Sequence, residues 1–240
     1  MLTLAVLALA ISAADAQRPG PRSPRHDRNY DENGFQIAEK GNVSARLRVA
    51  FPMCFGTLVP LGGDVESFPK TSFKQNFYYS LDIASIYLSS ESSPWAASIG
   101  VRMTFMDFYM QNPDQSYRYD SASKKWEAYS ISSVESKYDR KMSKIQSDYV
   151  GVPVRLYYNV GHAKFFAGAG ADYMFSASTK YKSPKVKSEA NDLFNRFKAN
   201  AEVGFAYGGI GVFASYSFTP VLSRTVSDAG VLSFGLALGL

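Results

Sequence analysis

The chain has a single cysteine, Cys54, and only two histidines, His26 and His162. One cysteine cannot form an internal disulfide or build a four-cysteine zinc site, and two histidines do not favour a histidine-based metal centre or catalytic triad. Beyond the first residues there is no run of about 18 apolar residues, so no transmembrane helix is predicted. The formal net charge of +5 is too modest to indicate a nucleic-acid partner.

Aromatic residues, in contrast, are abundant. The 240 residues include 17 Phe, 16 Tyr and 2 Trp, which together make up 15% of the chain. Hydrophobic residues reach 46% and charged residues 20%, a balance that excludes a disordered chain. The length suits one large domain or two small ones.

The first residues are typical of an export signal. Residues 1–14 are almost all small or apolar, and Ala14-Asp15-Ala16 has the small-x-small pattern that signal peptidase cleaves. The segment is too short to cross a hydrocarbon layer of about 30 Å. We therefore predict a signal peptide over 1–16, with a buried helix as the alternative.

Residues 17–43 follow as a basic, proline-rich stretch. Its proline and charge density is too high for a packed core, which predicts a periplasmic tether. A solvated tether is the simplest interpretation, and contact with acidic polymers or anionic lipid headgroups is the alternative. The residues that define it are Pro19, Pro21, Pro24, Arg18, Arg22, Arg25 and Arg28.

From residue 44 onward, apolar and polar residues alternate with a period of two, which indicates β-strands with one apolar face. The clearest case is 197–207, where Phe197, Val203 and Phe205 share a face opposite Lys198 and Glu202. The alternation predicts eight strands, most of them longer than the usual 5–6 residues. They are 44–55, 73–88, 95–110, 147–159, 163–176, 195–207, 210–219 and 231–240.

The connections between these strands alternate in length. Short turns at 89–94, 160–162 and 208–209 fall between long loops at 56–72, 111–146, 177–194 and 220–230. This alternation is characteristic of outer-membrane barrels, whose short turns face the periplasm. We therefore predict an all-β fold: an eight-stranded antiparallel up-and-down transmembrane β-barrel over 44–240.

The direction of the apolar face separates a membrane barrel from the alternative, a soluble lipocalin-like barrel. Small residues such as Gly168, Gly170 and Gly204 lie on the face opposite the large apolar side chains, where they suit a cramped lumen. Aromatic residues near the short turns indicate an interfacial girdle. The expected girdle comprises Tyr87, Trp95, Tyr158, Phe165 and Tyr207.

The same alternation directs nine charged residues into the lumen. Buried charges need partners, so a salt-bridge network across the barrel is expected. Structural packing of the interior is the favoured role, and a narrow proton or ion path is the alternative. The nine residues are Arg46, Arg48, Asp82, Arg102, Arg155, Lys164, Asp172, Lys198 and Glu202.

The sequence does not support catalysis. His162 falls in a short periplasmic turn and His26 in the tether, away from the outer rim where small barrel enzymes place their active sites. The loop carboxylates are scattered, whereas acid–base chemistry needs a positioned pair. No nucleophile, metal-ligand or phosphate-binding motif occurs, so no catalytic residue, metal site or cofactor is predicted.

The longest loop, 111–146, is rich in tyrosine, serine and lysine. Amphipathic aromatic side chains beside cations are typical of recognition surfaces, and a solvated hairpin extension is the alternative. The candidate recognition residues are Tyr117, Tyr119, Trp126 and Tyr129. In the same loop, Asp120-Ser121-Ala122 resembles a short O-glycosylation signal of exported Bacteroidetes proteins, which makes Ser121 a candidate site.

Three segments resemble the PorT-like outer-membrane β-barrel family of Bacteroidetes. They are 149–158 (YVGVPVRLYY), 165–173 (FFAGAGADY) and 203–212 (VGFAYGGIGV). The family's strand also contains a proline at the position of Pro153, a residue that is otherwise disfavoured in mid-strand. The chain departs from the family at Ser215-Tyr216, where an Arg-Tyr pair is common, and at its last residue, Leu240, where barrels usually have an aromatic residue. The resemblance implies a fold and an outer-membrane location, and no particular activity.

Taken together, these features predict a non-enzymatic protein of the bacterial outer membrane. The favoured function is a structural, adhesive or recognition role of the surface loops. The second candidate is a subunit of a secretion or uptake complex, and the third is an enzyme with its active site at the barrel rim. The expected partners are outer-membrane lipid, the barrel-assembly machinery and an unidentified protein at the long loops; no nucleic acid is expected.

Overall fold

The computed structural model describes residues 30–31, 34–40, 43–60, 76–90, 92–123, 125–131, 142–182, 185–223 and 229–239. The expected signal peptide and most of the tether lie outside the described residues. Within the described ranges, no helix is both long and apolar enough to cross a membrane.

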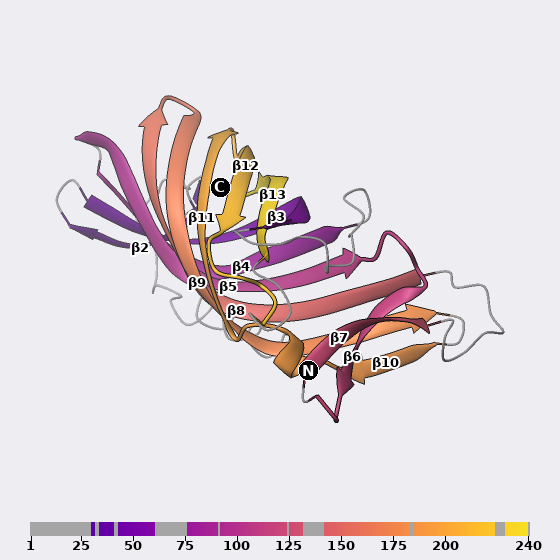
Figure 1. The fold of residues 1–240 in the computed structure, drawn as a ribbon. Coiled ribbons are helices and arrows are strands. Elements are labelled where there is room, and N and C mark those ends of the chain that lie inside the picture. Colours follow the sequence, from indigo (N-terminus) through magenta and orange to yellow (C-terminus); the bar gives the residue numbers. More distant parts are fainter. Residues whose placement is uncertain are drawn as a thin grey trace.

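Eight long strands form a closed antiparallel barrel (Figure 1). Each strand pairs with the next one along the chain, and the last also pairs with the first, which leaves no open edge between them. This confirms the predicted eight-stranded up-and-down fold. The strands are β3 (Val43–Pro60), β4 (Phe77–Ser90), β5 (Ser93–Tyr109), β8 (Met142–Val160), β9 (Ala163–Lys182), β11 (Phe197–Tyr207), β12 (Ile210–Ser217) and β13 (Ala229–Leu238).

Short turns occur at the three places that the sequence predicted, although the first is shorter than the predicted 89–94, because β4 runs to Ser90 and β5 begins at Ser93. Two residues, Gly161-His162, join β8 to β9, and Gly208-Gly209 join β11 to β12. Both glycines of the Gly208-Gly209 turn have positive φ, 56° and 82°, as a two-residue type I′ hairpin requires. Because neighbouring barrel strands are antiparallel, these alternate connections lie together at one end of the barrel.

At the opposite end of the barrel, two strands extend further than predicted. β8 begins at Met142 instead of residue 147, and β9 continues to Lys182 instead of residue 176. The predicted 36-residue loop contains its own two-stranded sheet, and the next loop contains a further strand and a 3₁₀ turn. These elements are β6 (Gln115–Asp120), β7 (Lys125–Ser130), β10 (Val186–Glu189) and η2 (Asn191–Leu193).

Two strands fall in the segment expected to be a tether. β1 (Tyr30–Asp31) pairs with β2 (Gly34–Lys40), and β2 pairs with the start of β3, from Phe35 opposite Leu47 to Lys40 opposite Val43. β13 pairs with the rest of β3, from Phe51 to Pro60. β2 therefore pairs with the first residues of β3, and β13 pairs with the remainder of the same edge. The last part of the expected tether is thus a strand of the sheet.

The large apolar side chains point away from the barrel interior. On β8, Val152, Val154 and Leu156 are about half exposed, while Arg155 and Tyr157 on the opposite face are buried. The same alternation continues on β9 and β11. A soluble barrel would have the opposite arrangement, with apolar residues inside, so the lipocalin-like alternative is wrong.

Charged residues mark the edge of this apolar belt that lies toward the long loops, hereafter its upper edge. The outward face of β5 is apolar from Trp95 to Phe105 and polar from Asp107, and that of β8 is apolar from Tyr158 to Val150 and polar from Asp148. Phe105 and Asp148 pair across the two strands, so both edges lie at one level. The belt spans about 9–11 residues per strand, the length needed to cross a membrane.

Aromatic residues surround the lower edge of the belt. Trp95 packs edge-to-face on Tyr158, with ring centroids 4.9 Å apart, and Phe165 lies 5.1 Å from Phe205. The prediction that Tyr87 belongs to this girdle is wrong, because Tyr87 is buried in the lumen with 1% of its surface exposed.

Candidate functional site

Four charged side chains from four strands meet in the middle of the lumen. Arg102 of β5 donates from Nε to Oδ1 of Asp82 at 2.7 Å and lies 3.1 Å from Oε2 of Glu202. Arg155 of β8 lies 2.6 Å from Oδ2 of Asp82 and also pairs with Glu202. Each arginine contacts both carboxylates, so the four residues form a closed ring, hereafter the ion-pair ring, in which two positive and two negative charges balance.

A glycine makes room for two members of the ring. Gly168 of β9 lies between Arg155 of β8 and Glu202 of β11 in one cross-strand row. A Cβ atom at Gly168 would lie 2.9 Å from Arg155 Cγ and 3.3 Å from Glu202 Cγ. The missing side chain lets the guanidinium and the carboxylate extend across β9 toward each other.

A second cluster lies beside the ring. Lys198 Nζ is 3.0 Å from Asp172 Oδ2, and Asn200 donates to the same oxygen at 2.8 Å. The Lys198 ammonium also lies 4.6 Å from the centre of the Tyr149 ring. Gly151 is required opposite Asp172, because a Cβ there would lie 1.8 Å from Asp172 Oδ1.

The remaining predicted lumen cations do not join the ring. Arg48 stacks on Tyr87 at 3.9 Å from the ring centre and lies 5.7 Å from that of Tyr157. Lys164 is buried, and Arg46 is half-buried near the start of β3. Two groups of ion pairs are thus formed by the predicted lumen residues: the four members of the ring, and Lys198 with Asp172.

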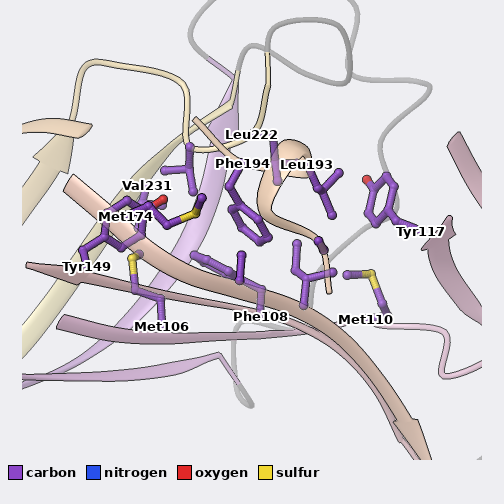
Figure 2. Close-up of a cluster of buried hydrophobic side chains, with 14 residues drawn as sticks. Met106, Phe108, Met110, Tyr117, Tyr149, Met174, Leu193, Phe194, Leu222 and Val231 are labelled. Carbon is purple, nitrogen blue, oxygen red and sulfur yellow. The ribbon is translucent and has the colours of Figure 1, made fainter. Parts of the chain in front are cut away.

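Beside the charged residues, toward the long-loop end of the barrel, buried apolar side chains form a cluster (Figure 2). Met106 and Phe108 of β5 and the following Met110 pack there with residues of β8, β9 and β6, and with Leu193 of η2 and Leu222 of the next connection. We call this cluster the apolar cap. The full set is Met106, Phe108, Met110, Tyr117, Ile145, Tyr149, Met174, Ala177, Ala190, Leu193, Phe194, Val221, Leu222 and Val231.

Sequence reasoning missed the cap, although a signal for it exists on β5. Inward residues are polar at Arg102 and Thr104 and become apolar at Met106 and Phe108, while the outward face becomes polar at Asp107. The two faces therefore exchange polarity at one level. That level is where a strand leaves lipid and enters water, since its outward face must then be polar.

The candidate recognition residues of β6 and β7 have different environments. Tyr117 is 4% exposed and packs in the cap, so the surface role expected for it is wrong, and burial raises its pKa. Trp126 packs partly against the cap, and Tyr119 lies against Trp126 but is half exposed. Tyr129 lies 5.2 Å below the Arg118 guanidinium.

Ser121 lies at the tip of the β6–β7 hairpin and is exposed. Asp120 closes this turn by accepting hydrogen bonds from the backbone N–H groups of Ala122 at 3.1 Å and Ser123 at 3.0 Å. Hydrogen bonds from the Ser123 side chain and from these backbone groups lower the pKa of Asp120.

The described residues include no candidate metal centre. Among them, no three His, Cys, Asp or Glu side chains lie close enough to hold a metal ion. His162 lies in a short turn beside Tyr207, with ring centroids 6.1 Å apart. The carboxylates of Asp82 and Glu202 each pair with two arginines, an arrangement that suits a structural role.

No family model matches the chain, and no curated protein matches it. Two solved structures are similar to it at 11% sequence identity each. Neisserial surface protein A (NspA) has a TM-score of 0.43, with 82% of this chain and 99% of that chain covered. Ail, the attachment invasion locus protein of Yersinia pestis, has a TM-score of 0.35, with 80% and 94% covered. The closed register of β3 to β13 and the outward apolar belt, taken from the chain itself, define it as an eight-stranded β-barrel of the transmembrane type.

Proposed function

We propose that this chain is an integral outer-membrane protein without enzymatic activity, and that it belongs to the PorT-like family that its strands resemble. Its lumen is closed, and its outward hairpin serves a structural, adhesive or recognition role. The observation that carries this proposal is the filling of the barrel at two levels, by the ion-pair ring within the apolar belt and by the apolar cap above it.

The two levels argue against transport through the barrel. Eight strands enclose a space that side chains fill. A solute crossing it would have to separate Arg102 and Arg155 from two buried carboxylates, and breaking a buried pair costs about 3–5 kcal/mol. It would then meet the apolar cap, whose described side chains are mostly hydrocarbon and sulfur. A structural role for the nine lumen charges follows from this arrangement.

The β6–β7 hairpin offers the best surface for recognition. Its exposed features are Tyr119, the Arg118–Glu127 ion pair of 2.7 Å and the tight turn that carries Ser121. Tyr117 and Trp126 anchor the hairpin on the cap, so its exposed side chains have a fixed base. A rigid platform with aromatic and charged side chains suits contact with a protein or glycan. An accessible Ser121 also supports the glycosylation that the sequence suggested.

The route to the membrane is part of the proposal. Residues 1–16 would direct export, the barrel-assembly machinery would insert the chain, and outer-membrane lipid would surround the apolar belt. The short turns and both chain ends would then face the periplasm, since the number of strands is even.

Cell fractionation tests the location. We expect the full chain in the outer-membrane fraction, and we expect a shift in its gel mobility on heating, since the hydrogen-bonded barrel resists detergent until it is heated. Recovery as a soluble periplasmic protein would overturn the proposal.

Protease treatment of intact cells tests the orientation. Loop 111–146 contains seven Lys or Arg residues, of which Arg118, Lys125 and Lys144 lie in hydrogen-bonded strands. We expect external trypsin to cut at the others, which are Lys124, Lys137, Arg140 and Lys141. Immunoblotting should detect two fragments of similar length.

The other outcomes of this experiment are also informative. Cleavage only in permeabilised cells would show that the topology is inverted. Resistance in both preparations would mean that a partner covers the loop, and would favour the second candidate function, a subunit of a secretion or uptake complex.

A further inference from the structure

The β9–β10 hairpin concentrates positive charge. Between residues 180 and 187, four of eight residues are lysine and none is acidic. Lys182, Lys185 and Lys187 are exposed, and Lys180 is half-buried.

The register of the strands gathers these lysines on one face. Lys144 of β8 pairs with Lys180 of β9, and Lys180 pairs with Lys187 of β10. Lys182 lies two residues further on the same face, and Tyr109 of β5 pairs with Lys144 at the end of the row. Like charges directly opposite each other on neighbouring strands are destabilising. The arrangement is therefore not explained by the stability of the sheet.

This face continues the lipid-facing belt. On β8, outward residues run from Leu156 to Val150 within the belt and then to Lys144, because alternate residues share a face. The Lys144 row lies four residues above the last apolar row, which contains Phe105. At about 3.3 Å per residue on tilted strands, the separation is roughly 10 Å along the membrane normal. The lysine row thus lies at the level of lipid headgroups, which occupy the outer several Å of a bilayer.

Carboxylates on this face neutralise only part of the charge. Lys144 is paired with Asp107 at 2.5 Å, and Lys180 donates to Gln146. Asp148 and Glu189 also belong to this face, next to the belt. Among the described residues, Lys182 and Lys187 form no ion pair. Partial burial and the charges of Lys144 and Lys187 lower the pKa of Lys180 by more than Asp107 and Asp148 raise it.

We propose that Lys180, Lys182 and Lys187 form a binding site for the phosphate groups of outer-leaflet lipids, whose acyl chains lie on the apolar belt below. The inference rests on the proposed membrane location. Lysine side chains near a membrane surface attract anionic headgroups, and long stems let the ammonium reach them. Tyr109, in the same row, suits the interface between headgroups and chains.

The test compares two double variants of the full chain in neutral detergent. Lys182→Gln/Lys187→Gln removes two exposed site charges, and the control Lys182→Arg/Lys187→Arg keeps both charges at the same positions. Each is titrated with bis-phosphorylated lipid A and with the same lipid after enzymatic dephosphorylation, and bound lipid is measured by native mass spectrometry. We expect the site variant to bind the phosphorylated lipid roughly 30-fold more weakly than the unsubstituted chain, and the control variant to bind it normally.

The outcomes separate this inference from the proposed function. Equal affinity of the site variant and the control for the phosphorylated lipid would overturn the phosphate site, as would equal binding of both lipid forms to the unsubstituted chain. Failure of every variant to enter micelles as a heat-modifiable barrel would instead overturn the membrane location. Heat-modifiability also shows that the site variant has folded.

Discussion

Removing the carboxylate of Glu202 should lower the free energy of unfolding of the barrel by about 3–5 kcal/mol. In Glu202→Ala, Arg102 and Arg155 would keep their positive charges in the lumen with only Asp82 between them, since each now contacts both carboxylates. The measurement is the urea midpoint in detergent, followed by the gel mobility of the folded form.

Two controls accompany this variant. Glu189→Ala removes a carboxylate of the same type from β10, where it is exposed, and should leave the midpoint unchanged. Glu202→Met combined with Arg155→Met removes one charge of each sign and should cost less than Glu202→Ala alone, because a buried pair can be replaced by apolar residues at little cost. Equal midpoints for Glu202→Ala and Glu189→Ala would show that Glu202 is solvated and that the ring contributes little.

A side chain at Gly168 should be nearly as damaging. In Gly168→Val, the new Cβ would lie 2.7 Å from the carbonyl oxygen of Val154 and 2.9 Å from Arg155 Cγ. The first contact is with backbone, which cannot move without breaking the ladder between β8 and β9. Overpacking of this kind costs about 1–3 kcal/mol, and displacement of Arg155 from the ring adds to it. We expect a lower urea midpoint and a smaller yield of heat-modifiable protein.

The adjacent residue provides a matched control. Ala167 precedes Gly168 on β9 but points outward and is exposed, so Ala167→Val adds apolar surface toward lipid. It should leave the midpoint unchanged or raise it. If both valine variants behave alike, the lumen at Gly168 has free space, and the close approach of Arg155 and Glu202 does not depend on glycine.

On β11 the sequence was sufficient to assign inward and outward residues, whereas Tyr87 of β4 points inward because a bulge between Asp82 and Ala84 shifts the alternation. Phe205 and Glu202 lie on opposite faces of β11 as the alternation predicts, because neighbouring side chains on a strand point to opposite sides. Strand ends were less predictable. β8 extends five residues beyond its expected start because its outward face becomes polar at Asp148, and the hydropathy contrast between its two faces fades while the strand continues.

The sequence by itself determined the number of barrel strands and the positions of the short turns between them, since these depend on local alternation and turn residues such as Gly208-Gly209. Only the tertiary structure decided which charges meet. Arg102 reaches Glu202, 100 residues away, while Asp172 pairs with Lys198, because the stagger between strands sets which inward residues share a level. It also decided that Tyr117 is a core residue, since the apolar cap assembles from segments that are far apart in the chain and have no common local pattern.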